Sequence, residues 1–270
     1  MTPWQSFAMV DWSGGNDRGP TPCKDAIWTC VVHAGLAEAP VYLRNRQQAE
    51  DWLITLIEAE LAAGRRLMLG FDFPFGYPAG FARALTGSSD PLTLWNWFET
   101  RVEDCPETNN RFDVAAEINH RFGGRGPFWA NALARDIEGL PRRKDSYRNP
   151  FPERRAVEYL AKGSFTCWQM AGAGAVGSQI MMGLPVLARL RRRFAGQVAT
   201  WPFEVLDRPI AFVEIWPSLN LGQPPAGLIK DAWQVQQVAL ELSRLPVAEL
   251  EHRLDIKAPE EGWILGVEPK

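Results

Sequence analysis

The sequence predicts an α/β fold, and three observations support this prediction. Short apolar runs of strand type alternate with amphipathic helical patterns toward both ends of the chain. Acidic residues stand where several of these runs end. The chain has 270 residues, of which 46% are hydrophobic and 23% are charged, so it can bury the core of one large domain or of two small ones.

Three strands are expected near the N-terminus. Residues 7–12 (FAMVDW) form a short apolar run that SGG ends, which is typical of a central strand that stops in a turn. Residues 25–33 and 39–44 are rich in β-branched and aromatic side chains, and only a short stretch separates them. Together these runs predict a meander of three strands.

A helix and a fourth strand follow this meander. From Gln47 to Ala63 apolar residues recur at helical spacing, and Gly64 ends the pattern. The next run, RRLMLGFDFPFGYP, is an apolar strand that carries Asp72 at its end and is stopped by two prolines. The predicted order is therefore β-β-β-α-β, with an acidic residue at the tip of the first and of the fourth strand.

Residues 79–165 have a different character. They are rich in Trp, Phe, Arg, Asn and Pro, with broken helical patterns and few strand signals. We expect a mainly helical insertion or cap here, between two parts of one α/β domain formed by residues 1–78 and 166–270.

Regular patterns return after the insertion. A glycine-rich stretch leads into a predicted helix at 176–194, and a strand at 209–215 and a helix at 229–245 follow, in the order α-β-α. The uncharged stretch 163–188 is a poor membrane span because it contains five glycines, a proline and two glutamines.

Four carboxylates occupy element ends in this prediction: Asp11, Asp72 and Glu214 at strand ends, and Asp231 in the first turn of the last helix. An unpaired charge at the tip of an apolar strand costs several kcal/mol unless something compensates for it. If the strands are neighbours, the carboxylates converge and raise one another's pKa values unless a divalent cation neutralises them. Two Mg²⁺ or Mn²⁺ ions about 4 Å apart, on oxygen ligands, can activate water and stabilise the leaving oxygen in phosphodiester hydrolysis. The competing interpretation is four unrelated turn and helix-start residues.

The motifs around these acids, VDWSGG, GFDFPFGYP, FVEIWPS and KDAWQVQQVA, resemble the corner motifs of the RNase H-like superfamily, specifically a bacterial family of uncharacterised predicted nucleases. That pattern has Asp at the end of the first strand, Asp followed by Pro at the fourth, Glu-x-x-Pro on a later strand and Asp-Ala at a helix start. The matching residues are, in this order, Asp11, Asp72 with Pro74, Glu214 with Pro217, and Asp231 with Ala232. The resemblance covers roughly residues 5–78 and 170–245.

The resemblance implies an RNase H-like mixed sheet with an insertion, and a divalent-metal-dependent nuclease of the two-metal type that uses Mg²⁺ or Mn²⁺. In this hypothesis Asp11 bridges two metal ions, Asp72 and Glu214 complete their coordination, and Asp231 holds the second ion. The substrate would be a nucleic acid, single-stranded or branched, or a nucleotide.

One element of ribonuclease H itself lacks a clear counterpart. Its helix-borne Glu could be matched only by Glu50 or Glu58. This departure keeps open an alternative function, a catalytically inactive RNase H-like module that binds a nucleotide or a protein partner.

The glycines of the stretch before residue 176 suggest a further alternative. Gly172, Gly174 and Gly177 spell G-x-G-x-x-G ahead of a helix, a pattern that brings backbone amides to a pyrophosphate. The preceding TCWQMA is a weak strand, so close packing of the loop competes with phosphate binding. A nucleotide-cofactor biosynthesis protein, of the molybdopterin guanine dinucleotide type, would use this loop.

Within residues 121–155 there are nine Arg or Lys residues against four Asp or Glu residues, with aromatic residues between them. Cations can neutralise phosphates while aromatic faces stack on unpaired bases, which predicts a groove for single-stranded nucleic acid. The competing interpretation is a solvated helix face above an ordinary aromatic core. The candidate nucleic-acid-binding residues, here called the basic segment, are Arg142, Arg143, Lys144, Arg148, Arg154 and Arg155.

Composition restricts the setting. A net charge of −3 excludes a dedicated nucleic-acid coat. The four cysteines form no C-x-x-C pair, which fits a reducing cytoplasm better than a disulfide scaffold or a structural zinc site. We expect a cytoplasmic protein without a membrane partner, which could assemble with copies of itself.

Overall fold

The computed structural model describes residues 3–219 and 221–269. Within them, seven strands form one mixed sheet in the order β3-β2-β1-β5-β7-β6, with β4 also paired to β2. β2 is antiparallel to β1, whereas β1, β5, β7 and β6 run parallel to one another. The bounds are β1 (Ser6–Asp11), β2 (Ile27–His33), β3 (Leu36–Ala37), β4 (Val41–Leu43), β5 (Leu67–Phe71), β6 (Val198–Thr200) and β7 (Ile210–Glu214).

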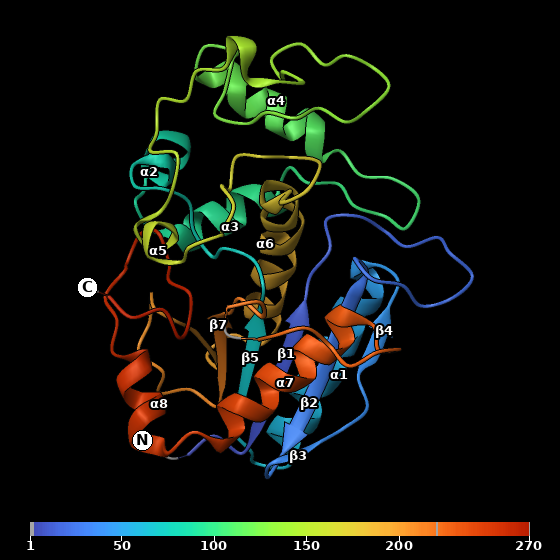
Figure 1. Ribbon diagram of the computed structural model, residues 1–270. Coiled ribbons are helices and arrows are strands. Elements are labelled where there is room, and N and C mark those ends of the chain that lie inside the picture. The colour runs from blue at the N-terminus through green and yellow to red at the C-terminus, as the bar shows by residue number, and fades with distance from the viewer. Residues whose placement is uncertain (1–2, 220, 270) are drawn as a thin grey trace.

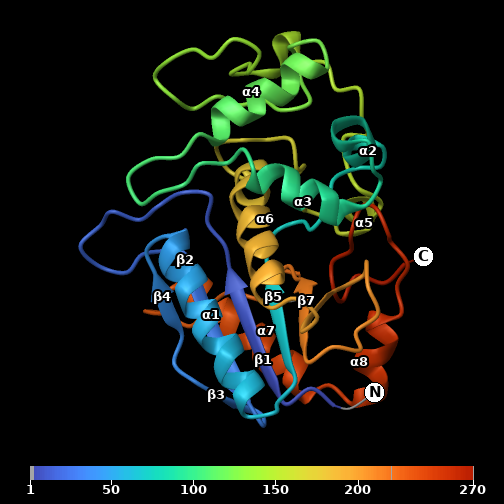
Figure 2. The same ribbon diagram turned by 180° about the vertical axis from the view of Figure 1, so that it is seen from behind.

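Helices cover both faces of the sheet (Figure 1). One face carries α1 (Arg46–Ala62) and α6 (Val176–Arg193), and the other carries α7 (Lys230–Arg244), with α8 (Val247–Leu254) beside it. Figure 2 shows α1 and α6 in front of the strands when the molecule is turned around. This three-layer arrangement buries each face of the central strands, which explains their uninterrupted apolar runs.

Alternate side chains of each strand enter different cores. Ala8 and Val10 of β1 belong to the core on the α1 and α6 face, whereas Phe7 and Met9 belong to the core on the α7 face. The alternation follows from the pleat, which points successive side chains to opposite faces. The same alternation determines which of the carboxylates at the strand ends lie on the same face of the sheet.

The insertion packs onto the sheet domain around α6. Its helices are α2 (Phe81–Thr86), α3 (Pro91–Glu99), α4 (Arg111–Arg121) and α5 (Ala156–Leu160), with a 3₁₀ turn at Lys144–Ser146. Trp95 and Phe98 of α3 share one hydrophobic cluster with Phe71 and Phe73, so the core is continuous from the sheet into the insertion. Gly183 permits the close approach of α6 to Phe73, because a Cβ there would lie 2.4 Å from Phe73 Cζ.

The α/β class is confirmed, and so are the main elements. The helices expected at 47–63, 176–194 and 229–245 are α1, α6 and α7, and their observed ends differ by at most one residue. The strand expected at 39–44 is β4, and the one expected at 209–215 is β7. β3, β6 and α8 were not predicted, because two- and three-residue strands and an eight-residue helix are too short for their periodicity to stand out. Among the residues that the structure describes, no helix is long and apolar enough to cross a membrane.

Candidate active site

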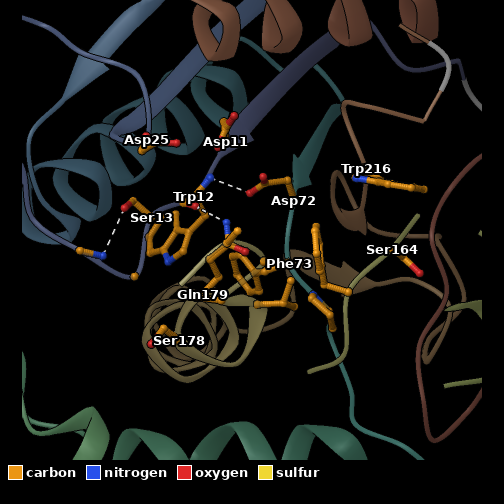
Figure 3. A pocket seen from close by; sticks show the side chains of 18 of the residues that line it. Asp11, Trp12, Ser13, Asp25, Asp72, Phe73, Ser164, Ser178, Gln179 and Trp216 are labelled. Atoms are coloured by element: carbon orange, nitrogen blue, oxygen red, sulfur yellow. Dashed lines mark hydrogen bonds between the residues drawn. The ribbon is translucent and has the colours of Figure 1, made fainter. Parts of the chain in front are cut away.

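A cavity of about 1010 Å³ opens where β1, β5 and β7 end (Figure 3). The starts of α6 and α7 contribute Val176 and Lys230 to its wall, and the glycine-rich loop 171–175 forms another part. All four carboxylates predicted from the sequence, Asp11, Asp72, Glu214 and Asp231, line it. The carboxyl ends of neighbouring parallel strands are a common location for binding sites in α/β proteins.

Asp11 and Asp72 form a pair. Val10 of β1 lies opposite Phe71 of β5 in the parallel register, so the next residue of each strand continues the pairing. Backbone hydrogen bonds hold the Asp72 end of this pair: the Trp12 amide donates to Asp72 Oδ1 at 2.6 Å, and the Asp72 amide donates to the Val10 carbonyl at 3.2 Å. The charge of Asp11 acts on Asp72, so the two carboxyl groups interact electrostatically.

Two further aspartates border the pair. Asp231, in the first turn of α7, accepts a hydrogen bond at Oδ2 from the Asp25 amide, with 2.7 Å between the atoms. Asp25 lies just before β2 in a left-handed backbone conformation, with φ of 62°. Their charges act on Asp11, as does that of Lys230, which has the opposite sign.

The carboxyl pair is strongly perturbed. Removal from solvent, followed by repulsion from Asp231, raises the pKa of Asp11 from 3.8 to about 8. The same loss of solvent and the charge of Asp11 raise the pKa of Asp72 well above its ordinary value. Without a cation, therefore, the pair holds a proton at neutral pH.

Glu214 lines the same cavity but does not join the pair. It lies opposite Phe71 in the β5–β7 register, one residue before the level of Asp72, and so points to the other face of the sheet. There it accepts a bidentate ion pair from Arg155, with Nη1–Oε2 at 2.8 Å and Nη2–Oε1 at 2.6 Å. The Phe75 amide also donates to its Oε2.

Arg155 supplies the neutralising charge for Glu214. Both residues are 1% exposed, and Arg155 Nε also donates to Glu158 Oε1 at 3.0 Å. Arg155, predicted to bind nucleic acid, does line the cavity, but its guanidinium already serves two internal carboxylates. Local sequence patterns do not distinguish an arginine that neutralises a buried carboxylate from an arginine that is exposed to solvent.

The other cations of the basic segment lie outside the wall of this cavity. Arg142 donates to Asp136, and Lys144 to Glu153, both as exposed ion pairs. Arg154 donates to the Ser164 carbonyl, while Arg143 and Arg148 are exposed. The aromatic residues of the stretch 121–155 turn inward: Phe128 is buried, and Phe122 and Phe151 contact each other at 5.0 Å between ring centroids.

The residues around Asp11 fit a divalent cation in part. Asp11 and Asp72 offer oxygen ligands, and positive charge there would relieve the repulsion that raises their pKa values. Glu214 does not fit, because Arg155 already occupies its carboxylate. Within residues 3–219 and 221–269, no three His, Cys, Asp or Glu side chains are placed so that together they could hold a metal ion. A cation at this site would therefore need water or substrate oxygens to complete its coordination.

Charged residues of the cavity wall that sequence reasoning missed include Asp25 and Arg111. Asp25 had a usable signal: because β2 runs antiparallel to β1, the residues before β2 lie at the same edge as Asp11, which pairs with Trp28. Arg111 had none, because it comes from the insertion and its place depends on how α4 packs.

Comparison of the chain with protein-family models, with curated proteins and with solved structures found no match.

Proposed function

We propose that the protein hydrolyses phosphodiester bonds at the Asp11–Asp72 pair, with a divalent cation as cofactor. One observation carries the proposal: two carboxyl groups at the ends of neighbouring parallel strands line one cavity of about 1010 Å³, with pKa values raised and with no Arg or Lys as an ion-pair partner among the described residues. Structural carboxylates at strand ends are usually paired or solvated, so an unneutralised pair in a cavity points to a site.

The strand order supports an RNase H-like architecture for the proposed enzyme. An antiparallel unit of four strands, β1 with β2 and the β3 and β4 partners of β2, is followed by β5 and β7 running parallel to β1. This agrees with the order that the resemblance implies and puts the first and fourth predicted strands side by side.

The acidic residues of the cavity have distinct roles in this proposal. Asp11 and Asp72 would hold the cation, and Asp231, fixed by the Asp25 amide, would orient a water or a second cation beside them. When bound, Mg²⁺ or Mn²⁺ supplies a Lewis acid that lowers the pKa of water and stabilises charge on the phosphate. Glu214 has a structural part, because it ties β7 to the insertion through Arg155.

Asp11→Asn tests the proposal. The variant should lose Mg²⁺- or Mn²⁺-dependent cleavage of single-stranded and branched oligonucleotides by at least ~100-fold, on the scale of losing a principal electrostatic group. Asp51→Asn is the matched control, because Asp51 is exposed on α1 and does not line the cavity. Cleavage by Asp11→Asn at the parent rate would refute the assignment.

The ion pair between Glu214 and Arg155 favours a second candidate function, binding of a nucleotide without hydrolysis. With one predicted carboxylate neutralised internally, fewer oxygen ligands remain for metal ions. Calorimetric titration with Mn²⁺ separates the two functions: saturable binding that Asp11→Asn abolishes supports the hydrolase, whereas no binding at millimolar Mn²⁺ supports the binding module.

A further inference from the structure

The wall of the cavity contains a cation contributed by the insertion. Arg111, at the start of α4, lines it together with Ser178 of α6. Arg111 Nε donates to Ser178 Oγ at 2.9 Å, and Nη1 donates to Asn109 Oδ1 at 2.6 Å. Both partners are neutral, and the described residues give Arg111 no carboxylate at ion-pair distance.

The charge of Arg111 is poorly compensated. Its burial, followed by repulsion from Arg46, lowers the pKa of its guanidinium to about 10. The nearby Asp104 is bound to Arg46 by two hydrogen bonds, at 2.7 and 2.6 Å, so it serves that arginine first. A partly buried cation without its own anion is costly to keep, which favours an external anion as partner.

The hydrogen bonds of Ser178 fix the direction of this guanidinium. Ser178 Oγ donates to the Met170 carbonyl at 2.5 Å, so its lone pairs remain to accept from Arg111. The planar group is held at Nε and Nη1, and its Nη2 has no hydrogen-bond partner within the described residues. A fork held in this way suits two-point recognition of a phosphate.

Trp12 provides a second, independent donor without an acceptor. Its indole is 1% exposed, and Nε1 has no hydrogen-bond partner among the described residues. In Figure 3 this nitrogen points away from Asp72 and toward the turn of α6 that carries Ser178. Gly14 brings its loop to the same turn, where a Cβ would lie 2.8 Å from Ser178 Cβ. Leaving a buried N–H unpaired is unfavourable, and a bound acceptor would remove this penalty.

We propose that Arg111, with the Trp12 indole N–H as a second donor from the wall of the same cavity, forms a subsite for a phosphate group of the substrate other than the one that is hydrolysed. The assignment of this phosphate to a substrate rests on the proposed function, whereas anion binding at Arg111 does not. A ligand with two phosphates, such as an oligonucleotide, would place one at the carboxyl pair and the next at Arg111. Arg111 would then position the chain without taking part in bond cleavage.

Inorganic phosphate is the probe, titrated calorimetrically into the metal-free protein in the presence of EDTA. The parent should bind phosphate saturably, and Arg111→Met should weaken that binding by roughly tenfold or more, the size of one charge-assisted hydrogen bond. Met keeps the side-chain stem against Phe112, over whose ring the guanidinium lies at 4.5 Å. Arg121→Met is the control on the same helix, since Arg121 pairs with Glu117 at the surface, and it should bind phosphate like the parent.

Two results would overturn the subsite: no phosphate binding by the parent at concentrations well above those of the cell, or equal affinity in the parent and Arg111→Met. If Arg111→Met does not fold, Ser178→Ala replaces it, because removal of the Oγ acceptor leaves the guanidinium without its fixed orientation. Ser178→Ala should bind phosphate several-fold more weakly than the parent. Unchanged affinity in this variant overturns the proposal. Asp11→Asn should keep phosphate binding while losing metal-dependent cleavage, so failure of the subsite and failure of the proposed hydrolase give different results.

Discussion

The Asp11–Asp72 pair should make the metal-free protein less stable as pH rises. The pKa of Asp11 is 3.8 in an ordinary setting and about 8 in the folded protein, so between these values the folded state holds a proton that the unfolded chain releases. The free energy of unfolding that this proton contributes is fully present below about pH 4 and is lost as pH approaches 8.

The expected magnitude follows from the two pKa values. Each pH unit between them changes the free energy of unfolding by at most about 1.4 kcal/mol. From about pH 5.5 to about pH 8 the loss should approach about 3 kcal/mol. Asp11→Asn removes the titrating charge and one neighbour of Asp72, so the variant should lose most of this slope and should exceed the parent in stability near the upper end of that range.

The assay is urea denaturation in EDTA at several pH values, followed by tryptophan fluorescence. Asp51→Asn serves as the control and should reproduce the slope of the parent. Adding Mg²⁺ at about pH 8 should raise the stability of the parent and leave Asp11→Asn unchanged, since a ligand stabilises only the state that binds it. The reasoning fails if the parent is equally stable at both ends of the pH range, or if Asp11→Asn keeps the parent's slope.

Three further predictions concern the scaffold and the basic segment. Arg155→Met leaves Glu214 as a buried carboxylate without a cation, so urea denaturation should show that the free energy of unfolding falls by about 3–5 kcal/mol. Adding Glu214→Gln in a double variant should restore part of this stability, and no loss in Arg155→Met would mean that solvent reaches the carboxylate. Gly183→Ala inserts a methyl group against the Phe73 ring and should lower the free energy of unfolding by about 1–3 kcal/mol, with a matching fall in Tm; an unchanged Tm would mean that the ring moves aside freely. Replacement of all three residues 142–144 by Ala should weaken single-strand binding and reduce the log-log salt slope by roughly 0.7 for each phosphate that the segment no longer neutralises. Its Tm should stay close to that of the parent, because these side chains are exposed; unchanged binding and slope would remove this segment from the nucleic-acid hypothesis.

The sequence by itself determined the main helices and strands and the placement of Asp11 and Asp72 at one edge of the sheet. Apolar periodicity is a local property, so α1, α6 and α7 could be placed to within a residue at their ends. Asp11 and Asp72 could be expected at one sheet edge because each directly ends an apolar run, and neighbouring parallel strands end on the same side. The start of α7 likewise placed Asp231.

Only the tertiary structure decided which acids share a face and which cations remain available to a ligand. A shift of one residue in strand register turns a side chain to the opposite face, and this puts Glu214 on the side of Arg155 instead of beside Asp72. Arg111 reaches the cavity only because α4 packs against α6, an arrangement of distant segments that no local pattern encodes. Charge and periodicity can be read directly from the sequence. The pairing of charges depends on distances between segments that are far apart in the sequence, and only the packed core sets these distances.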